Sequence, residues 1–113
     1  MKAESFVVSP ETYEPALNVL GISVTVLASN ARTQGYEITL QSGAEGAGPP
    51  PHSHVWDESF FVLRGRVELS IDGKAYVYGP GTLVHLPAGT VHGVSAFQSM
   101  LDSVRRGSPC SVD

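Results

Sequence analysis

The chain has 113 residues, of which 42% are hydrophobic and 16% are charged, so its composition is that of one folded domain and has none of the bias expected of a disordered protein. Its 7 basic and 11 acidic residues give a net charge of −4, and no basic block is present. Nucleic-acid binding through phosphate contacts is therefore excluded as a main function. The one tight basic pair, Arg105-Arg106, falls in a polar segment that we expect to be a solvated tail.

The cysteine content and the apolar runs bear on the cellular setting. Cys110 is the only cysteine, so no internal disulfide can form, and a reducing, cytoplasmic setting fits best. The run Phe6–Val8 is too short for a signal peptide, and the largely apolar stretch Val19–Ala28 is far shorter than a membrane span. We therefore expect a soluble protein.

The first third of the chain predicts an irregular entry and two strands. Residues 1–20 are expected to be irregular, with one helical turn that starts at Ser9-Pro10 and stops before Pro15. Ile22–Ala28 is rich in β-branched residues and predicts a strand, followed by a loop over Asn30–Gly35. The next six residues alternate strictly, which predicts a half-buried strand with Tyr36, Ile38 and Leu40 on one face.

The rest of the chain predicts short strands separated by glycine and proline. Ser42–Pro51 is a loop of small residues that ends in three prolines, which stiffen the backbone before His52. Asp72-Gly73 is a strong signal for a two-residue hairpin. The expected strands cover residues 58–64, 67–71, 74–78, 82–86, 91–97 and 98–104, and residues 105–113 form the tail. Frequent strands without any helical period predict a single all-β domain, either a sandwich or a closed barrel.

Four residues of metal-ligand type stand at regular distances from the turn residues. They are His52, His54, Glu58 and His92. Three imidazoles and one carboxylate suit a single divalent ion such as iron, manganese, nickel, copper, cobalt or zinc. Taken alone, the His-x-His pair would more often be structural, and Glu58 would more often be a solvated charge.

The spacing of these residues resembles the two sequence motifs of the cupin superfamily. The first motif, G-x5-H-x-H-x3,4-E-x6-G, is filled by Gly46, His52, His54, Glu58 and Gly65. The second motif, G-x5-P-x-G-x2-H-x3-N, is filled by Gly81, Pro87, Gly89 and His92, whereas Ala96 replaces its final Asn. The resemblance implies a double-stranded β-helix, or jelly-roll barrel, and is strongest to single-domain cupins related to quercetin dioxygenases. It favours Glu58 over its neighbour Asp57 as the carboxylate ligand.

Strand geometry predicts what surrounds such an ion. Alternation along the strands would place Phe60 and Val62 on the same inward face as Glu58, and Val94 and Ala96 on that of His92. The ion would then lie in an apolar cavity and keep up to two open positions for a substrate or dioxygen.

Several other residues admit more than one interpretation. Asp57 is expected at the rim of the site. His85 is either a proton carrier on the inner face or, more often in such a position, a hydrogen-bonded structural histidine. Trp56 would line the cavity mouth, cover the outside of the barrel or form a subunit contact. Packing of the barrel is the expected role of the tyrosines Tyr36, Tyr76 and Tyr78.

The function predicted first is that of a metal-dependent dioxygenase for a small aromatic or enol-type compound, with Glu58 as a base, as the resemblance implies. A non-oxidative isomerase or cyclase that uses the metal as a Lewis acid is the alternative enzyme. A small-molecule binding module without turnover is the third possibility, because one fold serves many functions. We expect a homodimer, also from the resemblance.

Overall fold

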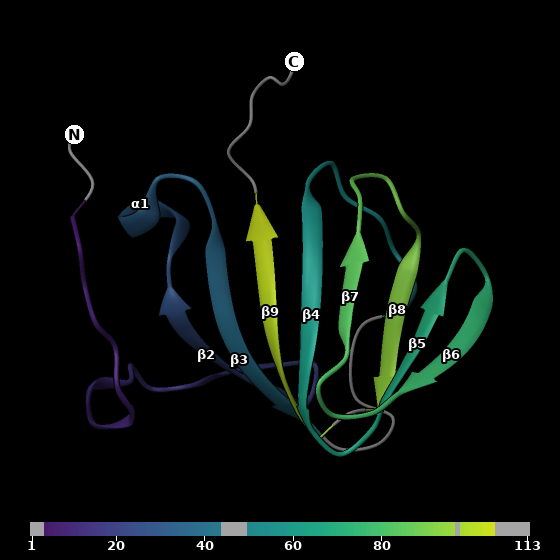
Figure 1. The fold of residues 1–113 in the computed structure, drawn as a ribbon, viewed down its shortest axis with the longest axis horizontal. Helices are drawn as coiled ribbons and strands as arrows, with labels where there is room; N and C mark the ends of the chain where they lie inside the picture. Colours follow the sequence, from purple (N-terminus) through teal and green to yellow (C-terminus); the bar gives the residue numbers. More distant parts are fainter. Residues whose placement is uncertain (1–3, 44–49, 97, 106–113) are drawn as a thin grey trace.

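The protein consists of short strands arranged in two antiparallel sheets, and the computed structural model describes residues 4–43, 50–96 and 98–105. The larger sheet has the strand order β1-β2-β3-β9-β4-β7, and the smaller has the order β6-β5-β8. In Figure 1 the two sheets stand side by side and their strands converge at the lower end. The elements are η1 (Pro10–Thr12), β1 (Leu17–Val19), β2 (Ile22–Ala28), α1 (Asn30–Thr33), β3 (Glu37–Gly43), β4 (Asp57–Arg64), β5 (Val67–Ile71), β6 (Lys74–Tyr78), β7 (Leu83–Leu86), β8 (His92–Ala96) and β9 (Ser99–Arg105).

The two sheets share one apolar core, which confirms the all-β prediction. The large sheet contributes residues such as Phe60 and Val62, and the small sheet contributes Val67, Leu69 and Val94. Val62 and Val67 have no exposed surface at all. The inward direction predicted for Phe60, Val62 and Val94 is thus confirmed, whereas the side chain of Ala96 lies outside the described residues.

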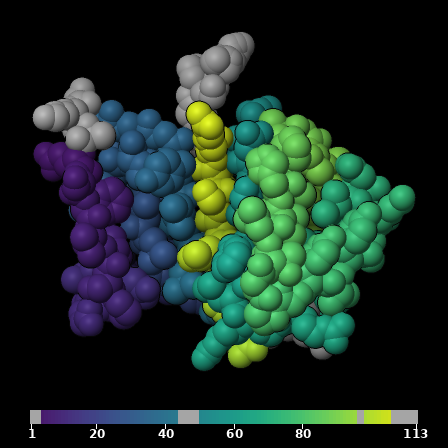
Figure 2. Space-filling view, viewed as in Figure 1, coloured from purple at the N-terminus to yellow at the C-terminus, as the bar shows by residue number. Residues whose placement is uncertain are grey.

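The order of the larger sheet brings distant parts of the chain together. Strand β9 lies between β3 and β4 and pairs with both in antiparallel register. The space-filling view shows β9 as a yellow band between the blue β2–β3 region and the teal and green strands (Figure 2). Side chains on β9 can therefore meet partners from the first and the second half of the chain.

Two predicted irregular segments contain regular structure. Within residues 4–20, η1 forms at the expected helical turn, but Leu17–Val19 also forms strand β1 and pairs with β2. The connecting turn places Leu20 and Gly21 at φ 52° and 84°, a conformation for which leucine gives no sequence signal.

The segment predicted as the loop 30–35 contains a single helical turn, α1. The Ser29 hydroxyl accepts a hydrogen bond from the Arg32 backbone N–H at 3.2 Å and so caps the turn. Gln34 ends it in the left-handed region at φ 62°. Local capping by a serine therefore gave this segment a helical turn that periodicity did not indicate.

The face predicted to be buried on β3 is wrong. Thr39 is only 6% exposed, and Gln41 lines the internal cavity, whereas Tyr36 is 43% exposed. Tyr36 and Ile38 instead line a surface hollow together with Phe6 of the entry segment. Ile38 of β3 thus lies on the side of the sheet toward this hollow, and Thr39 and Gln41 face inward.

Turn residues have the predicted roles where they can be examined. Asp72 and Gly73 have φ values of 49° and 83° and form the expected hairpin between β5 and β6. Gly65 has φ 72°, and a Cβ at this position would lie 2.5 Å from Cβ of Gln98. Gly46, Phe97 and the segment 106–113, which includes Cys110, lie outside the described residues.

Of the three tyrosines predicted to pack the barrel, Tyr78 contacts the core, whereas Tyr36 and Tyr76 are 43% and 38% exposed. The ring of Tyr78 stacks with that of Tyr76 at 6.0 Å between centroids.

Among the described residues there is no helix of the length and apolarity needed to cross a membrane.

Candidate metal centre

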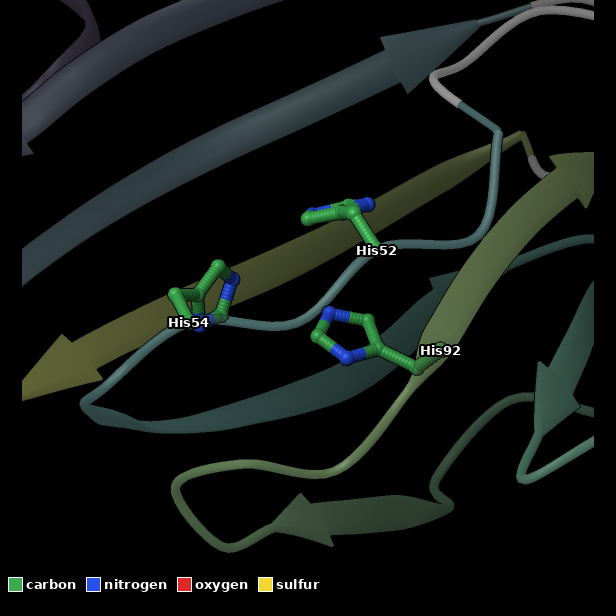
Figure 3. Close-up of side chains that lie close together, drawn as sticks. All are labelled: His52, His54 and His92. Carbon is green, nitrogen blue, oxygen red and sulfur yellow. The ribbon is translucent and has the colours of Figure 1, made fainter.

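The three motif histidines converge from two segments of the chain. His52 and His92 are joined by a two-residue antiparallel bridge, in which each backbone N–H donates to the other's carbonyl at 2.8 and 2.9 Å. His54 follows two residues after His52 in an otherwise irregular approach to β4. Figure 3 shows the three side chains gathered above the strands. The His-x-His pair is thus positioned by a single bridge and not by a continuous strand.

The imidazoles are close enough to share one ion. The centroid of the His52 ring lies 5.2 Å from that of His54 and 4.8 Å from that of His92, and the other pair is 5.1 Å apart. One ligand atom from each of the three residues lies within 4.8 Å of the other two. This spacing allows a single metal ion to contact all three.

Backbone carbonyls fix the orientation of two of these rings. Nδ1 of His52 lies 3.0 Å from the Pro50 carbonyl oxygen, and Nδ1 of His92 lies 3.0 Å from that of Thr90. A carbonyl can only accept, so each Nδ1 carries the hydrogen. Nε2 is the atom left to bind a metal, which is the usual way in which a surrounding hydrogen bond orients a histidine ligand.

Glu58 lies within the same cluster. It is 7% exposed, and its Oε1 lies 3.1 Å from Nε2 of His54 and 3.1 Å from Nε2 of His92. Burial alone would raise the pKa of Glu58, but hydrogen bonding with His92 and Asp102 and the charges of His92 and His54 outweigh it and lower the pKa. One carboxylate oxygen is therefore directed at two imidazoles and remains ionised.

The Glu58 carboxylate in turn changes the pKa of His92. Its hydrogen bond with Glu58 raises the pKa of His92, against the effect of burial, and the Thr90 carbonyl adds to the increase. Both shifts favour a carboxylate on Glu58 paired with a protonated His92. A divalent cation could replace the shared proton and leave both groups as ligands.

The residues around the cluster have distinct roles. The Trp56 indole stacks on the His54 ring at 4.5 Å and 13°, which places it beside the histidine cluster. The Asp57 carboxylate accepts from the Ala88 N–H at 2.9 Å and ties β4 to the Pro87–Gly89 turn.

His85 faces away from the site. Its neighbours Val84 and Leu86 are buried, whereas His85 is exposed and its Nδ1 lies 2.9 Å from the Ser59 hydroxyl. Of the two interpretations of His85, the structural one is therefore correct.

Three polar residues on the inner wall were missed in the sequence. Asp102 and Thr39 are 9% and 6% exposed, and Gln41 Nε2 donates to Thr39 Oγ1 and to Asp102 Oδ2, each at 2.9 Å. Burial first, and then the hydrogen bonding and negative charge of Glu58, raise the pKa of Asp102 to about 9. The available signal was the alternation of Met100, Asp102 and Val104 on β9, which puts an acidic residue at an inward position.

A cavity of about 200 Å³ connects this polar wall with the histidine cluster. Polar groups of the histidine cluster and of the wall formed by Gln41 and Asp102 line this cavity together with apolar side chains. Its lining is Val19, Ile22, Val24, Gln41, His52, Glu58, Phe60, His92, Val94, Met100 and Asp102. The candidate metal centre therefore opens onto a mainly apolar space with carboxyl groups in its wall.

Comparison with known proteins agrees with this geometry. The family model described as "Cupin domain" matches residues 37–99, and the chain belongs to this family. Quercetin 2,3-dioxygenase of Bacillus subtilis (strain 168) is 38% identical over 77 residues, which is 66% of this chain but only 23% of that enzyme.

Solved structures confirm the jelly-roll barrel. An RmlC-like cupin from Shewanella frigidimarina NCIMB 400 superposes with a TM-score of 0.80 at 18% identity, covering 99% of this chain and 100% of that one. KdgF from a Halomonas species superposes with a TM-score of 0.73 at 24% identity, covering 89% and 94%. At these identities the likeness establishes the fold alone.

Proposed function

We propose that this cupin is a metal-dependent enzyme that oxidises a small aromatic or enol-type compound with dioxygen, and that Glu58 is its catalytic base. The observation that carries the proposal is the position of Glu58, whose Oε1 lies 3.1 Å from two imidazole nitrogens in the wall of a mainly apolar cavity. The 38% identity to a quercetin 2,3-dioxygenase supports the oxidative reaction, although the match spans 23% of that enzyme.

His52, His54, Glu58 and His92 would together hold one divalent ion, and the donor set suits iron, manganese, nickel, copper, cobalt or zinc. Such an ion would supply Lewis acidity toward a substrate hydroxyl and, if it is redox-active, a route for electrons to dioxygen. The carbonyl bonds to Nδ1 of His52 and His92 support this use of the nitrogens, because they direct Nε2 into the cluster.

Side chains of the protein would supply the base and position the substrate. Glu58 is ionised and buried, so its carboxylate can take the proton of a substrate hydroxyl that enters the cavity. Phe60 and Val94 form apolar wall beside it and limit the access of water.

The size of the cavity restricts the substrate. Pockets for drug-sized ligands measure roughly 300–1,000 Å³, whereas this cavity measures about 200 Å³. We therefore propose a substrate with a single ring, or a chain of similar size, in preference to a flavonol with its three rings.

Oxygen uptake is the direct test. Protein purified without added metal is analysed for its metal content, loaded with each candidate metal and assayed with flavonols, catechols and β-diketones. We expect oxygen consumption with single-ring catechols or β-diketones. Glu58→Gln should reduce kcat at least roughly a hundredfold, as removal of a general base does. Asp57→Asn is the matched control and should retain activity, since an amide oxygen still accepts from Ala88. Absence of oxygen uptake across the panel would overturn the proposal.

A non-oxidative isomerase or cyclase is the second candidate, and one observation favours it. Burial and Glu58 raise the pKa of Asp102, while the pKa of Glu58 is lowered by its partners. Two carboxyl groups with opposite shifts in one cavity can act as acid and base without dioxygen. Turnover by the zinc-loaded protein under nitrogen would select this candidate.

We also propose that the protein is a homodimer. The edge strand β1 exposes 57% of Leu17 and 48% of Val19, a combination of free backbone and apolar surface that favours pairing with a second copy. Light scattering after size exclusion should give twice the monomer mass, and Leu17→Lys should shift the protein toward the monomer. A monomer mass at all concentrations would refute this.

A further inference from the structure

One buried carboxyl oxygen, Oδ1 of Asp102, has no hydrogen-bond partner among the described residues. The Asp102 side chain is 9% exposed, and its Oδ2 accepts from Gln41 Nε2. Leaving a buried acceptor unsatisfied destabilises the fold, and more so for a charged group, so such an atom calls for a ligand.

A hydrogen bond and the pairing of β9 with two strands fix the position of Asp102. Gln41 is fixed because its amide nitrogen donates to both Thr39 and Asp102, so the Asp102 carboxyl is held from a neighbouring strand. On β9, Asp102 lies opposite Thr39 of β3 and Phe60 of β4, which restricts its side chain on both sides. This carboxyl is therefore held on the inner wall by both neighbouring strands.

Asp102 and the metal-centre residues line the same cavity. The polar residues of the lining are His52, Glu58 and His92 at the histidine cluster, and Gln41 and Asp102 on β3 and β9. Apolar side chains such as Ile22, Val24 and Met100 supply the rest of the wall. A compound that fills about 200 Å³ therefore meets the histidine cluster, the neighbouring carboxyl groups of Glu58 and Asp102, and an apolar wall.

We infer that Asp102, held in place by Gln41, determines substrate specificity by hydrogen bonding to a neutral hydroxyl group at an end of the substrate that lies beside Glu58 and carries a hydroxyl in addition to the metal-binding oxygens. A hydroxyl both donates and accepts, so it can satisfy Oδ1 whether or not the carboxyl carries a proton. A carboxylate or phosphate at that end would place like charge beside two buried carboxyl groups. The preferred class is a small, single-ring or equally short compound with at least one hydroxyl beyond the pair that faces the metal. The inference rests on the proposed function for which end of the substrate meets the metal.

Matched probes test the recognition without turnover. Zinc-loaded protein is titrated by calorimetry under nitrogen with two pairs of compounds, hydroxyquinol with 4-methylcatechol and pyrogallol with 3-methylcatechol. Within each pair a hydroxyl replaces a methyl group of similar size. We expect the wild-type protein to bind the hydroxyl compound of at least one pair roughly tenfold or more tightly. If neither pair shows this preference, the inference is wrong.

Variants assign the preference to Asp102. Asp102→Leu, and Asp102→Val as a second variant of different shape, should abolish the discrimination while affinity for the methyl compound stays the same or rises. Ser103→Ala, the next residue of β9 on the opposite face, is the matched control and should keep the discrimination. Zinc affinity, followed through the fluorescence of Trp56 stacked on His54, verifies that each variant keeps its metal centre. A preference that survives in both Asp102 variants would also refute the inference.

The outcomes separate this inference from the proposed function. Discrimination that depends on Asp102, combined with no oxygen uptake, would leave the recognition intact and refute the dioxygenase. Oxygen uptake without a hydroxyl preference would support the dioxygenase and refute the recognition by Asp102.

Discussion

Replacing Asp102 with Asn should stabilise the metal-free protein, and the gain should grow with pH. Burial and Glu58 raise the pKa of Asp102 from 3.8 to about 9, so between these values the folded protein holds a proton that the unfolded chain has released. Stability is then full below the unfolded pKa and is lost as pH rises toward the folded pKa. Asn has a similar shape and does not titrate, so it removes this loss.

The dependence of the free energy of unfolding on pH sets the size of this stability gain. One proton bound only by the folded state changes the free energy of unfolding by about 1.4 kcal/mol per pH unit. Between about pH 5 and pH 7 the advantage of Asp102→Asn over the wild type should therefore increase by about 2.7 kcal/mol. For a domain of this size that corresponds to roughly 10 °C in Tm.

Urea unfolding in the presence of a chelator measures this difference. Trp56 is the only tryptophan of the chain and serves as the fluorescence probe. Ser103→Ala, on the same strand, should differ from the wild type by the same amount at every pH. If the advantage of Asp102→Asn is equal at the two pH values, the carboxyl does not keep its proton in the fold, and the explanation from burial and Glu58 fails.

Three further predictions concern the metal centre and one turn. Zinc should quench or shift the fluorescence of Trp56, which stacks on His54, and His92→Ala should weaken zinc binding at least roughly a hundredfold; an unchanged affinity in calorimetry would remove His92 from the ligand set. Because the pKa of His92 is raised, its proton must leave before metal binds, so zinc affinity should fall up to about tenfold per pH unit as the pH drops below that pKa; a flat profile would contradict this. Gly65→Ala should cost roughly 1–3 kcal/mol in urea unfolding, because its Cβ would lie 2.5 Å from Gln98 Cβ, whereas Gly73→Ala, with φ 83° but open space, should cost less; equal losses would show that φ alone matters.

The candidate ligand residues were accessible to sequence reasoning because their spacing is local and tied to turns. His52 and His54 follow a proline run, and Glu58 begins the inward alternation that continues through Phe60 and Val62. The Asp72-Gly73 hairpin was equally readable, since its two residues readily adopt positive φ. These parts of the fold follow from short-range rules.

The inner wall was not accessible, because it depends on a pairing between distant residues. Gln41 and Asp102 are 61 positions apart and meet only through the alignment of β3 with β9. Along β3 the apolar alternation of Tyr36, Ile38 and Leu40 indicated the wrong face, since Tyr36 and Ile38 line a surface hollow bordered by the entry segment. Periodicity reports where apolar surface is covered and does not reveal whether the cover is the core or a surface segment.

The insertion of β9 between β3 and β4 also constrains how the protein acquires its shape during synthesis. Strands β3 and β4 leave the ribosome early but have no direct neighbour in each other, so their facing edges stay unpaired until β9 has been made. Such long-range pairing makes folding slow and leaves strand edges open to other chains in the interval. Both the larger sheet and the polar wall around Asp102 must therefore be completed late, after the histidine segments have already been translated.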